Sequence, residues 1–104
     1  MSGVEGDWEL VVRTPVGRQD VRLHLVADAA GALAGTAAGP AETVPLEDVR
    51  LEGGHLTWAQ SITRPLRLRL LFDVEVDGDV LTGTSRAGRL PRSAVTGRRA
   101  RPRA

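Results

Sequence analysis

Only isolated polar side chains in this sequence could carry out catalysis. The chain has no Cys, and its two His residues, His24 and His55, are far apart along it. It contains no Gly-x-Ser-x-Gly motif, phosphate-binding loop, dinucleotide fingerprint or metal-ligand spacing. Any reaction must therefore depend on single polar groups that point into an apolar cavity, and we expect neither a metal nor a cofactor.

Three polar residues are the candidate catalytic groups: Asp48, Gln60 and His24. Gln60 lies on an alternating apolar face, where its amide needs a partner in the protein or in a ligand. Asp48 lies at an expected bulge. It is either an exposed turn residue or an inward acid whose pKa is raised by desolvation. His24 alternates outward with its charged neighbours, and a one-residue bulge would turn it inward as a general base.

Four residues are expected to shape the wall of such a cavity and to contact a substrate. They are Trp58, Leu70, Phe72 and Ser85. The Ser85 side chain is either small filler or a ligand contact. Asp73 and Glu75 fit a charged outer face, unless a phase change at the Leu70-Leu71 doublet brings both acids inside.

Alternation of apolar and polar residues predicts strands along almost the whole chain. Eight alternating runs are separated by Gly- and Pro-rich turns. The runs are 7–14, 19–27, 32–38, 43–51, 55–63, 66–77, 80–87 and 93–100. The run 43–51 changes phase near Glu47 and Asp48, which indicates a bulge. The long run 66–77 could bend into two strands, which would raise the total to nine or ten.

Two hairpins can be derived independently from their turns. One has a two-residue turn at 78–79, and the other a tight turn at 64–65. The predicted pairs are Phe72 with Ser85 and Trp58 with Leu70. Both hairpins place the same face of the run 66–77 inward. We therefore predict an all-β protein, an antiparallel up-and-down closed β-barrel, because closure removes exposed edge strands.

Trp8 and Arg99 are expected to close one end of this barrel. Gly6-x-Trp8 opens the first run, and Val95-x-Gly97-x-Arg99 ends the last, so the two motifs are neighbours in a closed meander. The guanidinium can then stack on the indole face. Together with the segment GALAGT at 31–36, these motifs resemble the calycin signature of avidins and lipocalins, and in particular short bacterial avidin/lipocalin-like proteins.

The resemblance extends from about Gly6 to Arg99 and implies two functions of different classes. Barrels of this kind include polyketide spiroacetal cyclases, which implies a cofactor-free ring closure of an apolar substrate with Asp48, Gln60 and His24 in the polar roles. The alternative is a non-catalytic, lipocalin-like carrier of an apolar metabolite. A barrel filled by its own side chains, acting as an interaction module, stays open as a third function.

Small residues at inward positions indicate that the barrel has room inside. They are Gly35, Ala37, Gly83, Ala87 and Gly97. A filled core would use larger residues at such positions. We therefore expect an apolar small molecule as the partner.

Composition and charge bound the remaining partners. The 104 residues, 41% of them hydrophobic and 26% charged, predict one domain over 1–104 with a basic, frayed tail from about residue 100. Basic residues gather in this tail rather than along the body, so we expect no nucleic-acid partner. No signal-peptide pattern and no apolar run near 18 residues occur, which predicts a cytoplasmic protein without a membrane partner. Apolar patches could pair two barrels in a homodimer.

Overall fold

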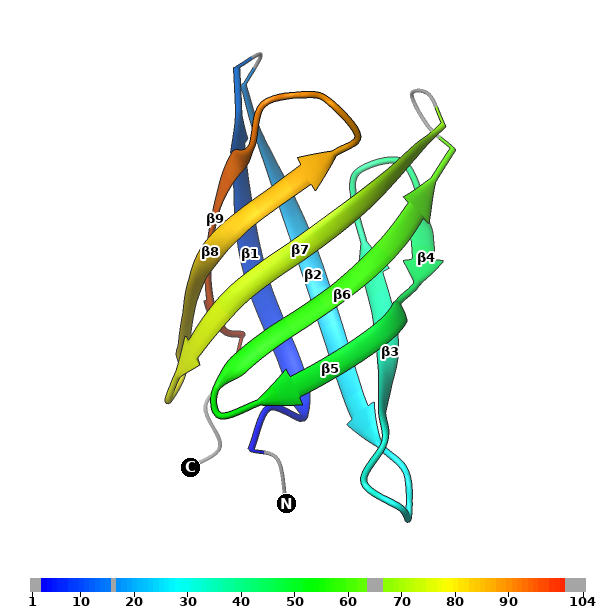
Figure 1. Ribbon diagram of the computed structural model, residues 1–104, viewed down its shortest axis with the longest axis vertical. Coiled ribbons are helices and arrows are strands. Elements are labelled where there is room, and N and C mark those ends of the chain that lie inside the picture. The colour runs from blue at the N-terminus through cyan, green and yellow to red at the C-terminus, as the bar shows by residue number, and fades with distance from the viewer. Residues whose placement is uncertain (1–2, 16, 64–66, 101–104) are drawn as a thin grey trace.

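Antiparallel strands make up the regular structure of the chain (Figure 1). The computed structural model describes residues 3–15, 17–63 and 67–100, and nine strands lie within these ranges. They are β1 Gly6–Thr14, β2 Gly17–Ala27, β3 Leu33–Ala38, β4 Thr43–Pro45, β5 Glu47–Glu52, β6 His55–Ile62, β7 Leu68–Asp77, β8 Val80–Ala87 and β9 Ser93–Arg99. Within these residues no helix has the length and apolar character needed to cross a membrane.

One sheet contains all of these strands, in the order β4-β3-β2-β1-β9-β8-β7-β6-β5. Each ladder is antiparallel, and the first strand pairs with the last, with Trp8 opposite Arg99. The predicted all-β, up-and-down barrel is therefore confirmed, with the sheet nearly closed (Figure 1). The two strands at the ends of the sheet, β4 and β5, are consecutive in the chain.

The seam of the barrel lies where the chain passes from β4 to β5. The Leu46 N–H still donates to Gly35 O of β3 at 2.9 Å, whereas Glu47 already pairs with Ala59 of β6. Asp48 then takes a φ of 53°, and the register shifts between Glu47 and Arg50. The expected bulge is confirmed, but it divides the run 43–51 into two strands. The ninth strand arises here, and not from a bend in 66–77.

The β6–β7 hairpin differs from its predicted register by two residues. Trp58 pairs with Phe72, and Gln60 pairs with Leu70, so the prediction that Trp58 faces Leu70 was wrong. The connection between the strands covers residues 63–67 and is longer than a tight turn; Leu66 and the turn at 64–65 lie outside the described residues. Because side chains alternate with a period of two, the shift leaves the same faces inward.

The β7–β8 hairpin has the predicted register. Phe72 lies opposite Ser85, and Gly78 takes a φ of 64° in the two-residue turn. The inward face of β7 continues without a phase change, because Leu71 is 53% exposed while Leu70 lines the interior. Asp73 and Glu75 consequently stay on the outer surface.

Apolar side chains fill the half of the barrel nearer the termini. Completely buried side chains here include Trp8, Leu23, Leu25, Leu56 and Leu81. The half at the other end holds Val12, Gln60, Phe72 and Ser85 and is less completely filled. The free space inside the barrel therefore lies at the end away from the termini.

Three of the five small inward residues have a different role from the one predicted. A Cβ at Gly35 would lie 1.9 Å from the His24 carbonyl oxygen, and one at Gly83 would lie 2.0 Å from the Asp73 carbonyl oxygen. At Gly97 the nearest atom, Glu9 O, would be 3.0 Å away. These glycines let neighbouring strands approach closely and do not open the interior. Ala37 and Ala87 do line a cavity.

Candidate functional site

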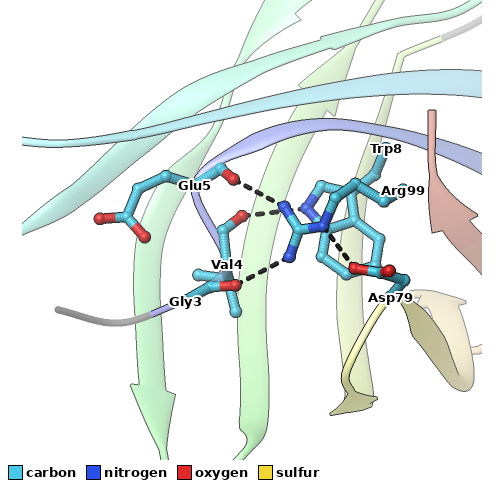
Figure 2. A network of polar contacts seen from close by, with 6 residues as sticks. All are labelled: Gly3, Val4, Glu5, Trp8, Asp79 and Arg99. Carbon is cyan, nitrogen blue, oxygen red and sulfur yellow. Dashed lines mark hydrogen bonds and ion pairs between the residues drawn. The ribbon is translucent and has the colours of Figure 1, made fainter. Parts of the chain in front are cut away.

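The end of the barrel beside the termini is sealed by Trp8 (Figure 2). The indole is fully buried, and its Nε1–H donates to the Val4 carbonyl oxygen at 2.9 Å. The Arg99 guanidinium carbon lies 4.5 Å from the centroid of the Trp8 ring, within the range of a cation–π contact. The sequence motifs for these two residues therefore meet at one place in the fold.

Arg99 ties two further segments to this seal, residues 3–5 and the β7–β8 turn (Figure 2). Its Nε donates to Asp79 Oδ1, its Nη1 to Glu5 O and its Nη2 to Gly3 O, each at 2.8 Å. The side chain is only 17% exposed. Since every guanidinium nitrogen has an acceptor, the group is held in place and is not presented to a ligand.

A cavity of about 580 Å³ occupies the opposite end of the barrel. Its wall comes from inward residues of seven strands: Val12, Val21, Ala37, Val44, Gln60, Ile62, Leu68, Leu70, Phe72, Ser85 and Ala87. Its rim comes from strand ends and the loops between them: Thr14, Pro15, Gln19, Gly39, Pro40, Ala41, Glu42, Leu90, Pro91 and Ser93. Strand alternation puts the wall residues there, because residues two apart along a strand face the same side of the sheet.

Gln60 is the main polar group in the cavity wall. The residue is 5% exposed, and its Oε1 accepts a hydrogen bond from Trp58 Nε1 at 3.0 Å. Trp58 itself lies behind the wall, stacked on Phe72 with ring centroids 4.7 Å apart and planes 5° apart. The Trp58 ring thus supports both the Phe72 face and the Gln60 amide.

Ser85 and Leu70 also reach the cavity, as the sequence predicted. Ser85 is 4% exposed and lies on β8, opposite Phe72. Leu70 is half-buried on β7, between Gln60 on β6 and Ala87 on β8. Gln60 and Ser85 are the buried polar residues of the described chain, and both face the same apolar space.

The structure places Asp48 and His24 outside the barrel, so the outward one of the two positions left open for each is found, and the inward position that a catalytic role needs is not. The Asp48 side chain is 79% exposed and lies 3.4 Å from Arg69 Nη2 on the outer surface. The bulge turns this carboxylate away from the interior. The His24 side chain is 53% exposed, and its Nδ1 lies 2.6 Å from Asp7 Oδ1. No bulge reverses the alternation of β2 at this residue, so His24 stays outward.

Glu42 is a site residue that sequence reasoning missed. It lines the rim of the cavity, and its carboxylate accepts hydrogen bonds from the Thr63 N–H at 2.6 Å and the Thr63 hydroxyl at 2.9 Å. These bonds fasten the loop before β4 to the end of β6, across the seam. Because Glu42 lies in a Gly- and Pro-rich loop, strand alternation gives no information about its direction.

Two titratable groups with perturbed pKa values, His55 and Glu47, lie on the outer surface. A hydrogen bond with Asp73 raises the pKa of His55 above its ordinary value of 6.5. A hydrogen bond from Arg69 lowers the pKa of Glu47. The first pair joins the neighbouring strands β6 and β7, and the second joins β5 to β7 across β6. Both lie on the outside, where water screens their contribution to stability. They have no contact with the cavity.

Comparisons with known proteins show no relative of this chain: no family model, no curated protein and no solved structure matches it. Within residues 3–15, 17–63 and 67–100, no group of three or more His, Asp or Glu side chains is placed to hold a metal ion. The chemistry of the candidate site therefore has to be argued from the cavity itself.

Proposed function

We propose that the protein binds an apolar small molecule in the cavity opposite the Trp8 seal. The observation that carries this proposal is the pair of buried polar side chains, Gln60 and Ser85, in an otherwise apolar wall. A largely apolar pocket with a few placed polar groups is typical of small-molecule sites, and about 580 Å³ lies within their usual size range.

The position of the charged residues favours binding over catalysis. The acid and the base expected from the sequence, Asp48 and His24, face solvent. A general acid or base must lie within hydrogen-bond reach of the reacting group, or one water away from it. We therefore place the carrier function first and the cyclase function second.

Fluorescence titration with N-phenyl-1-naphthylamine, an uncharged apolar probe, tests the binding function. We expect saturable 1:1 binding with enhanced emission, because the probe leaves water for an apolar wall. Ala87→Leu should weaken binding at least tenfold by filling the cavity. The matched control is Ala94→Leu, at an exposed position of β9, which should leave binding unchanged. Linear, unsaturable emission, or equal binding by both variants, would contradict the proposal.

A cofactor-free cyclase is the second candidate, and the position of Glu42 favours it. Its carboxylate lines the rim of the cavity whose wall contains Gln60. In a ring closure of a hydroxy ketone, a hydroxyl oxygen would bond to the carbonyl carbon and pass its proton to Glu42. The Gln60 amide would polarise the carbonyl oxygen, which would take this proton from Glu42 to give the hemiketal. A second hydroxyl oxygen would then bond to the same carbon and pass its proton through Glu42 to the departing oxygen, which leaves as water.

A long-chain dihydroxy ketone that can form a spiroacetal tests this second function. The cyclase function predicts spiroacetal formation above the uncatalysed rate, with saturation in substrate, and at least a tenfold loss in Gln60→Leu. Glu47→Gln changes a carboxylate on the outer surface and should leave the rate unchanged. A rate equal to the background at saturating substrate removes the cyclase and leaves the carrier.

A further inference from the structure

We propose that Gln60 is an oriented hydrogen-bond donor in the cavity and that it selects ligands with a carbonyl oxygen. This inference rests on the proposed binding function and specifies the ligand class. It depends on three features, namely the fixed Trp58 ring, the direction of the Gln60 amide that this ring imposes, and the free amide nitrogen.

The Trp58 ring is fixed by its packing. It is 2% exposed, and its face is stacked on the Phe72 ring of the neighbouring strand, at 4.7 Å between centroids. Trp58 and Phe72 are directly opposite each other in the ladder between β6 and β7. The indole Nε1–H therefore points in one direction and needs an acceptor there.

This indole decides which way round the Gln60 amide lies. An indole N–H is only a donor, and in the Gln60 amide only Oε1 can accept its hydrogen bond. The opposite orientation would set the Nε2–H group against the indole N–H at the present 3.0 Å separation. Oε1 is thus held by Trp58, and Nε2 is left as the other end of the amide.

The Gln60 Nε2 group opens on the cavity. It has no hydrogen-bond partner among the described residues, although the residue is 95% buried, being 5% exposed. No completely buried side-chain nitrogen or oxygen in the described part of the chain is unpaired, so Nε2 must retain some accessible surface. Since Gln60 lines the cavity, that surface faces a ligand.

A carbonyl oxygen is the ligand group that fits this donor. Nε2–H donates and cannot accept, so a ligand that offers only a donor gains nothing from it. A ketone, ester or lactone carbonyl accepts the bond and has no proton of its own to place in the apolar wall. Ser85 can either donate or accept, so it does not oppose this selection. It lies two strands away, on the order of 10 Å from Gln60 given the spacing of strands.

Two naphthalene probes of nearly the same shape test the selection. One is the ketone 6-propionyl-2-dimethylaminonaphthalene, whose emission moves to the red when its carbonyl accepts a hydrogen bond. The other is the 6-propyl analogue, which has a methylene in place of the carbonyl. We expect the ketone to bind at least tenfold more tightly and to emit at a longer wavelength than it does in a dry apolar solvent.

Variants of Gln60 and Trp58 separate orientation from simple packing. Gln60→Leu should cost the ketone at least tenfold in affinity, shift its bound emission to the blue and leave the propyl analogue bound as well or better. Trp58→Phe should reduce the ketone preference while keeping the amide, because the amide can then turn around. Thr82→Leu, at an exposed position on the outer face of β8 and outside the cavity lining, is the control and should change neither affinity nor emission.

The outcomes distinguish this inference from the proposed function. If both probes bind with equal affinity, and Gln60→Leu leaves the ketone emission unchanged, the selection by Gln60 is wrong while the binding cavity stands. If neither probe binds the wild-type protein, the cavity does not take apolar ligands, and both proposals fall together.

Discussion

Arg99 connects three segments of the chain through a single side chain. It lies against the Trp8 ring and donates to Asp79 and to backbone carbonyls near the N-terminus. Its planar group matches three acceptors and one aromatic face at the same time, which a compact ammonium group cannot do. Charge alone therefore does not explain why an arginine is needed here.

Replacing this residue by Arg99→Lys should lower the free energy of unfolding by about 1–3 kcal/mol, because the three acceptors lose their fixed donors and the Trp8 ring loses the stacked guanidinium. Urea denaturation monitored by Trp fluorescence measures the change. Arg98→Lys, at the neighbouring exposed position on the same strand, should change the free energy of unfolding by less than about 0.5 kcal/mol. Equal effects of the two substitutions would mean that the stacking of Arg99 on Trp8 contributes nothing to the free energy of unfolding.

His55 gives the protein a pH response on its outer surface. The hydrogen bond with Asp73 raises the pKa of His55 in the folded state, so folding favours the protonated imidazole. The resulting stability is fully present below the ordinary pKa of 6.5 and is lost as the pH rises through the folded-state pKa. Histidine titration by NMR should show the raised pKa in the wild type.

Asp73→Asn should bring the pKa of His55 back toward its ordinary value and should flatten this part of the pH dependence of stability. Asp77→Asn, further along the outer face of β7, is the control and should leave the titration of His55 in place. An unchanged pKa of His55 in Asp73→Asn would show that the hydrogen bond with Asp73 does not raise this pKa.

At the scale of strands, glycine sets how closely the ladders approach. Gly83 on β8 lies against the β7 backbone, where a Cβ would be 2.0 Å from Asp73 O and 2.6 Å from Val74 Cα. Because a carbonyl and an α-carbon cannot move like the end of a side chain, the strand itself would have to shift. Strand curvature here depends on the absence of one methyl group.

Gly83→Ala should therefore lower the unfolding free energy by about 3 kcal/mol or more, or prevent folding. Gly39→Ala is the matched control, since its new Cβ would meet nothing closer than Glu42 O at 3.8 Å. Thermal and urea denaturation of the two variants give the comparison. Near-wild-type stability of Gly83→Ala would show that β7 and β8 are not held at this separation.

Strand alternation predicted the faces of the sheet more reliably than its registers. The β7–β8 register followed from the two-residue turn at Gly78, whereas the β6–β7 register was two residues off because its connection is longer than a tight turn. A shift of two leaves the inward face unchanged, so the sequence pattern cannot detect it. The inward positions of Gln60 and Ser85 survived this error for the same reason.

The direction of side chains outside the regularly alternating strands could not be predicted from the sequence. The phase change at 43–51 located a bulge, but its direction depends on the positive φ of Asp48, which sends the carboxylate outward. Glu42 belongs to a loop, and its bonds to Thr63 bring together residues 21 positions apart. Similarly, a glycine at an inward position gives the same sequence pattern in two cases, one in which it leaves space in a cavity and one in which it lets a neighbouring strand approach. The sequence therefore cannot distinguish the two roles.

The whole molecule is a barrel with one filled half and one hollow half. Trp8 and the leucines around it occupy the end beside the termini, while the cavity of about 580 Å³ lies at the other end. A small protein gains stability from the first half and gives up buried area in the second. Ligand binding should restore part of that loss.

A ligand that binds only the folded barrel should raise its melting temperature. At a ligand concentration 100 times Kd, the gain is about 2.7 kcal/mol, which corresponds to roughly 10 °C or more for a domain of this size. Differential scanning calorimetry with the naphthyl ketone measures the shift. Ala87→Leu should show little shift at the same ligand concentration, and an equal shift in that variant would place the ligand elsewhere.

The division of the interior can be read directly from amide chemical shifts during titration with the naphthyl ketone. We expect the largest shifts at Val12, Ala37, Gln60, Phe72 and Ser85, with those of Trp8, Leu25 and Leu81 in the filled half nearly unchanged. Shifts concentrated around Trp8, or absent throughout the cavity wall at saturating ligand, would contradict a hollow, ligand-binding end of the barrel.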